Sequence, residues 1–174
     1  MVEAAQRYHA ERRAEPLREL LEPQVRTAIM ELLEGVDQVA SANDVLQARL
    51  KARLGEGVAA RLDRSGVANA VGPFSPAARV IDEKIDGQRA VVTYQIADRL
   101  PLSEVNLVLG DDRWLIQSDQ PIPGLAAEMR NLAEALRIVA DRVESDKLDA
   151  DGAAKELELR QRPVLDRIAA LTKK

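Results

Sequence analysis

The sequence has no cysteine and a single histidine, His9, so several kinds of chemistry lack the residues they need. Without cysteine there is no disulfide, no thiolate nucleophile and no thiolate ligand for zinc or an iron–sulfur cluster. One histidine excludes a pair of histidine ligands within one chain. His9 itself lies in a charged, weakly periodic N-terminal segment, where a structural or exposed role is expected. The sequence therefore predicts no metal, no cofactor and no catalytic residue, and it favours a protein that is not an enzyme.

Long apolar runs and a positive charge excess are also missing. No run approaches the roughly 20 apolar residues of a membrane span, so none is predicted. Asp and Glu number 29 against 25 Lys and Arg, and the formal net charge of −4 disfavours binding to nucleic acid. The N-terminus lacks the apolar segment of a signal peptide. We expect a cytoplasmic protein if Met1 is the native start, and an extracytoplasmic one if an upstream leader was removed.

Residue types are distributed in blocks along the 174 residues. Good helix formers dominate residues 1–64 and 124–172, whereas β-branched and aromatic residues gather in 77–118. Blocks of one element type favour an α+β fold over an alternating α/β fold. We predict a single α+β domain over residues 1–174. It has N-terminal helices, a four-stranded antiparallel meander sheet and a C-terminal helical hairpin that extends the domain.

Punctuating residues set the boundaries of these elements. The cluster 41–44 contains three residues whose side chains can cap a helix, Ser41, Asn43 and Asp44. It predicts that one helix ends and another begins there. Two Gly and two Pro in residues 65–76 predict a loop. Asp86-Gly87 predicts a hairpin turn, and Pro163 is expected to kink or split the last helix.

Aromatic residues are few: one Trp, two Tyr and one Phe. Tyr94 and Trp114 fall on predicted strands, and Asp98 follows Tyr94 near the end of the same strand. Core packing is the first interpretation of such aromatics, since they dominate core energetics. The alternative is a sheet–helix cavity in which Tyr94, Asp98 and Trp114 bind a small molecule.

One helical stripe after residue 124 has the most regular spacing in the chain. Its apolar residues recur at intervals of four and three, with charged residues on either side. Such a stripe packs into a core or forms an interface with a partner helix. The candidate interface residues are Leu125, Met129, Leu132, Leu136, Val139 and Val143.

Two stretches, 87–94 and 105–116, resemble the sheet half of the nuclear transport factor two-like superfamily. The matching positions are Gly87, Ala90, Val92, Val105, Leu107, Val108, Asp112, Trp114 and Ile116. The resemblance covers about residues 23–118. It implies a cone-shaped α+β fold with a cavity between sheet and helices, in a family of small-molecule binders, isomerases, dehydratases and non-enzymatic dimerising domains. That family usually ends near the last strand, whereas residues 124–172 follow here and would plug the cavity, cover the sheet or mediate dimerisation.

These observations favour a non-catalytic interaction or scaffolding domain that self-associates through helical surfaces. Its partner would be a second copy or another protein, since symmetric dimers are the commonest assembly. The alternative function is a small-molecule-binding or isomerase-like domain that uses the cavity near Tyr94, Asp98 and Trp114. A basic segment over residues 49–64 suggests a third, weaker hypothesis of anion binding.

Overall fold

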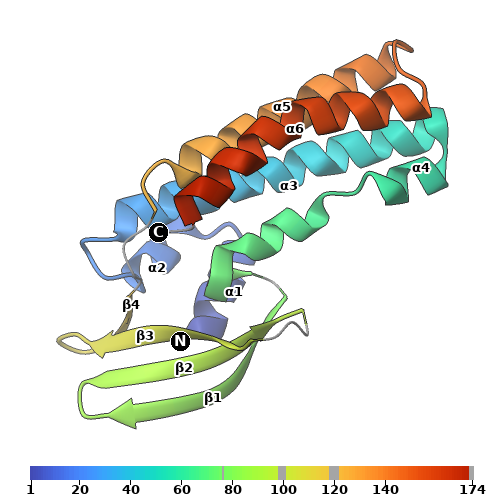
Figure 1. Ribbon diagram of the computed structural model, residues 1–174. Coiled ribbons are helices and arrows are strands. Elements are labelled where there is room, and N and C mark those ends of the chain that lie inside the picture. The colour runs from blue at the N-terminus through green and yellow to red at the C-terminus, as the bar shows by residue number, and fades with distance from the viewer. Residues whose placement is uncertain (76, 98–100, 118–121, 173–174) are drawn as a thin grey trace. The chain divides into compact units, whose positions relative to one another are not determined.

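The computed structural model describes residues 1–75, 77–97, 101–117 and 122–172, and it has the predicted α+β class (Figure 1). The elements, in chain order, are α1 (Val2–Ala10), α2 (Ala14–Glu19), α3 (Arg26–Leu54), α4 (Glu56–Arg61), the 3-10 helix η1 (Ser65–Phe74), β1 (Ala78–Asp86), β2 (Arg89–Ile96), β3 (Ser103–Leu109), β4 (Trp114–Gln117), α5 (Leu125–Glu144) and α6 (Ala150–Thr172).

The chain separates into two compact units. The first, here the sheet unit, comprises Met1–Leu33 and Asn69–Pro121, and the second, the helical unit, comprises Glu34–Ala68 and Ile122–Lys174. The division falls inside α3, so the start of that helix belongs to the sheet unit and the rest to the helical unit. The single domain over residues 1–174 stays a prediction.

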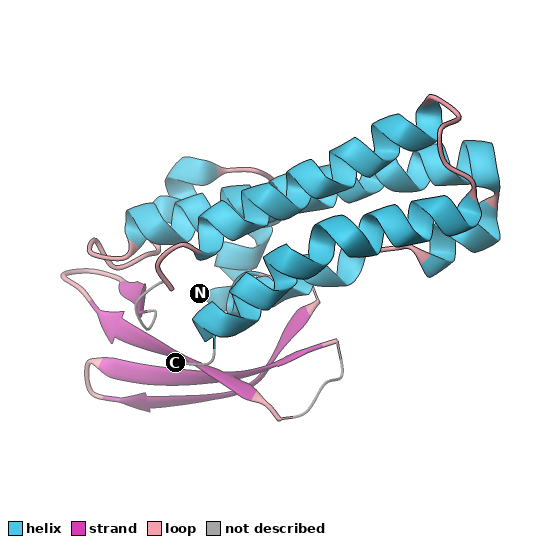
Figure 2. Ribbon diagram, turned by 45° about the horizontal axis from the view of Figure 1, so that its top comes forward, coloured by secondary structure: helices cyan, strands magenta, loops and turns pink. Residues whose placement is uncertain are grey.

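In the sheet unit, the four strands form an antiparallel meander in the order β1-β2-β3-β4, as predicted (Figure 2). Asp86 pairs with Arg89, so the predicted turn at Gly87 joins β1 to β2, and Gly87 has the positive φ of 57° that such a turn requires. One face of β2 is buried and carries Ala90, Val92 and Tyr94, as the alternation in the sequence predicts.

The two edges of the sheet differ. Beside β4, the Ile116 amide donates to the Leu20 carbonyl at 2.7 Å, and the Glu22 amide donates to the Ile116 carbonyl at 3.1 Å. The segment after α2 therefore continues the hydrogen bonding past β4. At the other edge, β1 is exposed from Ile81 to Asp86, and it carries an irregularity between Val80 and Asp82 together with several charges. Bulges and charges are features that discourage edge-to-edge aggregation.

In the helical unit, the long helices α3, α5 and α6 run side by side in both views (Figures 1 and 2). The helices α3 and α5 approach closely at Gly35, where an added Cβ would lie 3.0 Å from Met129 Cβ and 3.1 Å from the Ala126 carbonyl oxygen. This contact explains a glycine inside a helix, which otherwise costs about 1 kcal/mol relative to alanine. No helix in the described parts of the chain has the length and apolar character needed to cross a membrane.

Three boundary predictions were wrong. First, α3 continues through residues 41–44. Asn43 is 2 % exposed there; its Nδ2 donates to Asp63 Oδ1 at 2.8 Å, and its Oδ1 accepts from the Arg64 amide at 2.9 Å. The side chain that resembles a helix cap instead holds the segment after α4 against α3. Second, the predicted loop 65–76 is largely the 3-10 helix η1, Ser65–Phe74.

Third, the expected split of the last helix at Pro163 was wrong, since α6 runs from Ala150 to Thr172, while the alternative of a kink at Pro163 stays a prediction. A proline inside a helix removes the hydrogen bond to the carbonyl four residues earlier, which here belongs to Leu159. Both Pro163 and Leu159 are exposed, so water can satisfy that carbonyl. The solvent side of a helix is the place where this loss costs least.

Candidate functional site

The structure does not bring the two aromatic residues of the predicted ligand site together. Tyr94 pairs with Ser103, near the start of β3, whereas Trp114 pairs with Leu109, at its end. Six residues along a strand span about 20 Å. Asp98 lies outside the described residues. Tyr94 and Trp114 are therefore too far apart to contact one small ligand, and the small-molecule function stays a prediction.

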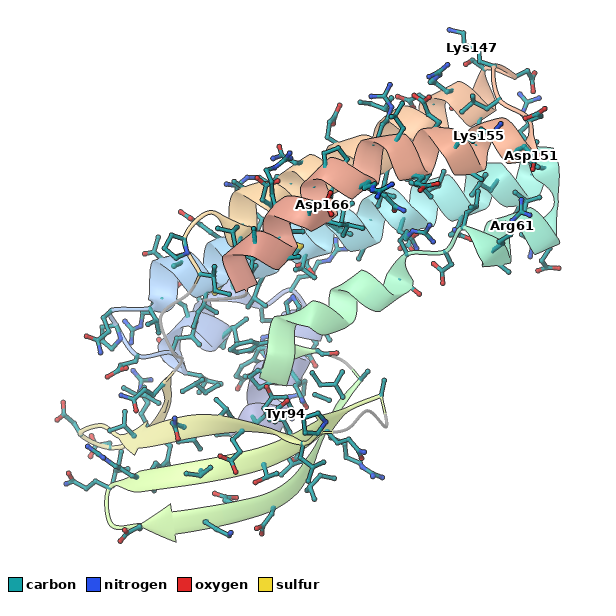
Figure 3. All side chains as sticks on the ribbon, in the orientation of Figure 1. Arg61, Tyr94, Lys147, Asp151, Lys155 and Asp166 are labelled. Atoms are coloured by element: carbon teal, nitrogen blue, oxygen red, sulfur yellow. The ribbon has the colours of Figure 1, made fainter. Side chains whose placement is uncertain are left out.

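Tyr94 has the environment of a core side chain. It is 6 % exposed, and burial raises the pKa of its phenol, while a hydrogen bond with Ser103 acts in the opposite direction. A phenol with a raised pKa stays protonated at neutral pH. The side chain, labelled in Figure 3, is thus buried in the sheet unit. Its hydroxyl is hydrogen-bonded, as expected for a buried tyrosine.

The apolar stripe of α5 is packed within the helical unit. Leu125 is partly exposed, and the other five side chains are at most 3 % exposed: Met129, Leu132, Leu136, Val139 and Val143. In this arrangement the stripe is core, which is the first of the two interpretations given for it. A partner would reach these residues only if the helices separated, so an interface at this stripe stays a prediction. The exposed surfaces of the helical unit lie outside the stripe.

Most cations of the basic segment 49–64 hold the helical unit together. Arg49 pairs with Asp141 and, at 2.8 Å, with Glu144 of α5. Arg53 donates to Asp146 at 3.2 Å, and Lys51 lies 2.6 Å from Glu56. Arg64 Nε donates to Gln161 Oε1 of α6 at 2.9 Å. These cations are engaged with acceptors of the same unit, which leaves less charge for a polyanion.

Two carboxylates join α5 to α6. Glu156 of α6 accepts from Arg160 at 2.7 Å and also from Arg142 of α5, and its side chain is 14 % exposed. Glu128 of α5 accepts from Arg167 of α6 at 2.9 Å, with its own side chain 15 % exposed. Hydrogen bonds from Arg160 to Glu156 and from Arg167 to Glu128 hold the pKa of each carboxyl below its usual range. Both groups are thus ionised at neutral pH and act as links between helices rather than as proton donors.

Within the described ranges, no group of three or more His, Cys, Asp or Glu residues is arranged to hold a metal ion.

Open clefts on the described residues of the helical unit include one between α3 and α4 and one on α6. One, of about 290 Å³, lies between α3 and α4, and the buried Nε2 of Gln47 at its wall has no hydrogen-bond partner among the described residues. Its lining comprises Gln47, Ala48, Lys51, Glu56, Ala59 and Ala60. The other, of about 340 Å³, lies on α6. Its lining comprises Lys155, Glu158, Leu159, Arg162 and Pro163.

The cleft on α6 contains the most exposed large apolar side chain among the described residues, Leu159, at 70 %. Together with Asp166, one turn further on, the residues of this cleft form what is here called the α6 outer face. The core residues Leu157 and Val164 lie on the opposite side of the helix, at 0 % and 5 % exposed. This face was not predicted from the sequence, in which the regular apolar stripe of α5 is the stronger pattern. The 4-3-4 spacing of Lys155, Leu159, Arg162 and Asp166 places them on one side of the helix, but mainly charged residues at this spacing are common on solvated helix surfaces.

Comparison with known proteins gives no match: no protein-family model, no curated protein and no solved structure is similar enough to place the chain in a family. The resemblance to the nuclear transport factor two-like superfamily accordingly stays a prediction.

Proposed function

We propose that this chain is a non-catalytic interaction or scaffolding domain that self-associates through a helical surface, the α6 outer face. The observation that carries the proposal is Leu159, which lines an open cleft and is 70 % exposed, on a helix whose opposite side is buried at Leu157 and Val164. Burial of a leucine side chain is worth about 1.5–3 kcal/mol, so a partner that covers it gains free energy.

The surroundings of Leu159 suit a reversible contact. Charged side chains border it, as polar residues border the apolar centre of protein interfaces. Lys155 and Glu158 precede it, and Arg162 follows it. A single pair of helices buries less than the roughly 1,200 Å² of a stable interface, so we expect association that depends on concentration.

The carboxylates with lowered pKa support the same function. Glu128 and Glu156 are ionised and engaged in holding α5 to α6. Their interactions fix α6 on the unit, which gives its outer face a defined shape before any partner arrives. A surface that is ordered in advance loses less conformational entropy on binding.

Sedimentation equilibrium of the wild-type chain over a concentration series, up to about 1 mM, tests the proposal. We expect a monomer at low concentration and a reversible dimer at high concentration. Leu159→Asp should weaken the dimer at least tenfold, because it places a charge in the contact. A wild-type chain that stays monomeric throughout would refute the proposal.

Val45→Asp is the matched control. Val45 is 41 % exposed on α3 of the same unit, so it is a comparable apolar side chain away from the α6 outer face. We expect this variant to associate like the wild type. Equal weakening by both variants would show that Leu159 is not at the contact.

A further inference from the structure

The α6 outer face carries its charges in an alternating order. Along the helix they are Lys155, Glu158, Arg162 and Asp166, which is positive, negative, positive and negative. Glu158 and Arg162 already form an ion pair of their own at 3.9 Å, with both side chains well exposed. Lys155 and Asp166, labelled on α6 in Figure 3, have no ion pair or side-chain hydrogen bond with any other described residue.

Followed in the opposite direction along the helix, the same four residues are negative, positive, negative and positive. When two copies of the face meet with their helices antiparallel, each positive residue lies opposite a negative one. Lys155 then faces Asp166 of the partner subunit, and Glu158 lies beside Arg162 of the partner subunit. When the helices are parallel and in register, every charge faces its own copy, and all four contacts are repulsive.

The spacing of the face makes this pairing geometrically possible. Lys155, Leu159, Arg162 and Asp166 recur at intervals of four, three and four, and so form one straight stripe on the helix. Lys155 and Asp166 are eleven residues apart, or about 16 Å along the axis. A two-fold axis near the midpoint of this stripe places Leu159 against the aliphatic part of Arg162 of the partner subunit, which can cover an apolar neighbour.

We infer that the partner of the α6 outer face is a second copy of this chain, docked with its α6 antiparallel about a two-fold axis. Lys155 and Asp166 form reciprocal ion pairs across the contact. The inference rests on the proposed function and adds to it the identity of the partner and the orientation of the helices. In this contact Leu159 supplies the burial, and the charges select the orientation, as flanking charges do in coiled coils.

Charge reversal tests the inference by sedimentation equilibrium of the full chain at low salt. Two-fold symmetry means that Lys155→Asp replaces two attractive contacts with two repulsive ones. We expect the dissociation constant of the dimer to rise by about tenfold for Lys155→Asp and likewise for Asp166→Lys. The double variant restores opposite charges and should return to within about threefold of the wild-type value.

Lys147→Asp is the control for net charge, because Lys147 is exposed in the turn after α5, outside the α6 outer face. It changes the total charge as Lys155→Asp does, and it should leave the dissociation constant unchanged. Far-ultraviolet circular dichroism confirms that each variant stays folded, which is expected because all the changed residues are exposed.

Cross-linking tests the orientation separately, and the cysteine-free chain makes single thiols unambiguous. A mixture of Lys155→Cys and Asp166→Cys chains should be joined by a short bis-maleimide, while each variant alone should cross-link far less. The reverse pattern would mean parallel helices and would overturn the inference.

A dimer in which the double variant is weaker than both single variants would also overturn the inference while the proposed function stands. A strictly monomeric wild-type chain would instead remove the proposed function itself.

Discussion

The contact at Gly35 allows a prediction in which two effects of known size oppose each other. In Gly35→Ala the new Cβ would lie 3.0 Å from Met129 Cβ and 3.1 Å from the Ala126 carbonyl oxygen. Atoms of this kind pack best at about 3.5–4.0 Å, so α3 and α5 must move apart. Overpacking of this sort costs about 1–3 kcal/mol, whereas replacement of a helical glycine by alanine gains up to about 1 kcal/mol. The cost exceeds the gain because one of the two opposing atoms belongs to the backbone of a packed helix.

We therefore expect Gly35→Ala to lower the free energy of unfolding of the helical unit by about 1 kcal/mol. Urea unfolding followed by far-ultraviolet circular dichroism measures this change. Gly57→Ala is the matched control, since Gly57 also lies in a helix, α4, and an added Cβ there meets nothing within 4 Å. That variant should be neutral or more stable by up to about 1 kcal/mol. Equal stabilisation by both substitutions would refute the close approach of α3 to α5.

Three further predictions concern capping, pH and the two units. Asp149 Oδ1 accepts from the Gly152 amide at 2.7 Å at the start of α6. Asp149→Ala should therefore lower the free energy of unfolding by about 1 kcal/mol in a thermal melt, and Asp149→Asn, which keeps an acceptor oxygen, by much less. Equal losses in the two variants would mean that this hydrogen bond does not stabilise the helix. Glu128 and Glu156 have a lowered pKa in the folded state, so their contribution to stability is present above the pKa of an unfolded glutamate, about 4.3, and is lost as the pH falls through the lowered values. The Glu128→Gln/Glu156→Gln variant should thus lose less stability than the wild type between about pH 5 and pH 2, and an unchanged pH dependence would contradict this. Trp114 fluorescence reports on the sheet unit and circular dichroism mainly on the helices, so coincident urea transitions would support the predicted single domain and separate transitions would contradict it.

The sheet was predictable because its signals are local. The alternation from Ala90 to Tyr94 places every second residue in the core, and Asp86-Gly87 sets the turn before it. The buried stripe of α5 was predictable for the same reason, since its spacing is regular and uninterrupted. The α+β class follows from these elements.

The boundaries failed where a distant contact outweighs a local signal. Asn43 has the chemistry of a helix cap, but its partners are Asp63 and Arg64, twenty residues further on. A glycine at position 35 weakens the helix by itself, and its presence is explained only by the close approach of Met129. Contacts between residues so far apart in the chain leave no periodic pattern.

The candidate site was harder still to predict. Tyr94 and Trp114 lie on the same sheet, but the strand register places them at different ends of β3. The α6 outer face consists mainly of charged residues, which in a sequence resemble any solvated helix surface. Only the 70 % exposure of Leu159 and the cleft around it distinguish this face.

The most direct test of self-association through α6 is a dilution series of amide proton–nitrogen NMR spectra of the unmodified chain. We predict that concentration-dependent shifts concentrate at Lys155, Leu159, Arg162 and Asp166, while the amides of β1 and of the buried stripe of α5 stay constant. Shifts confined to other elements, or spectra that do not change up to about 1 mM, would contradict the account.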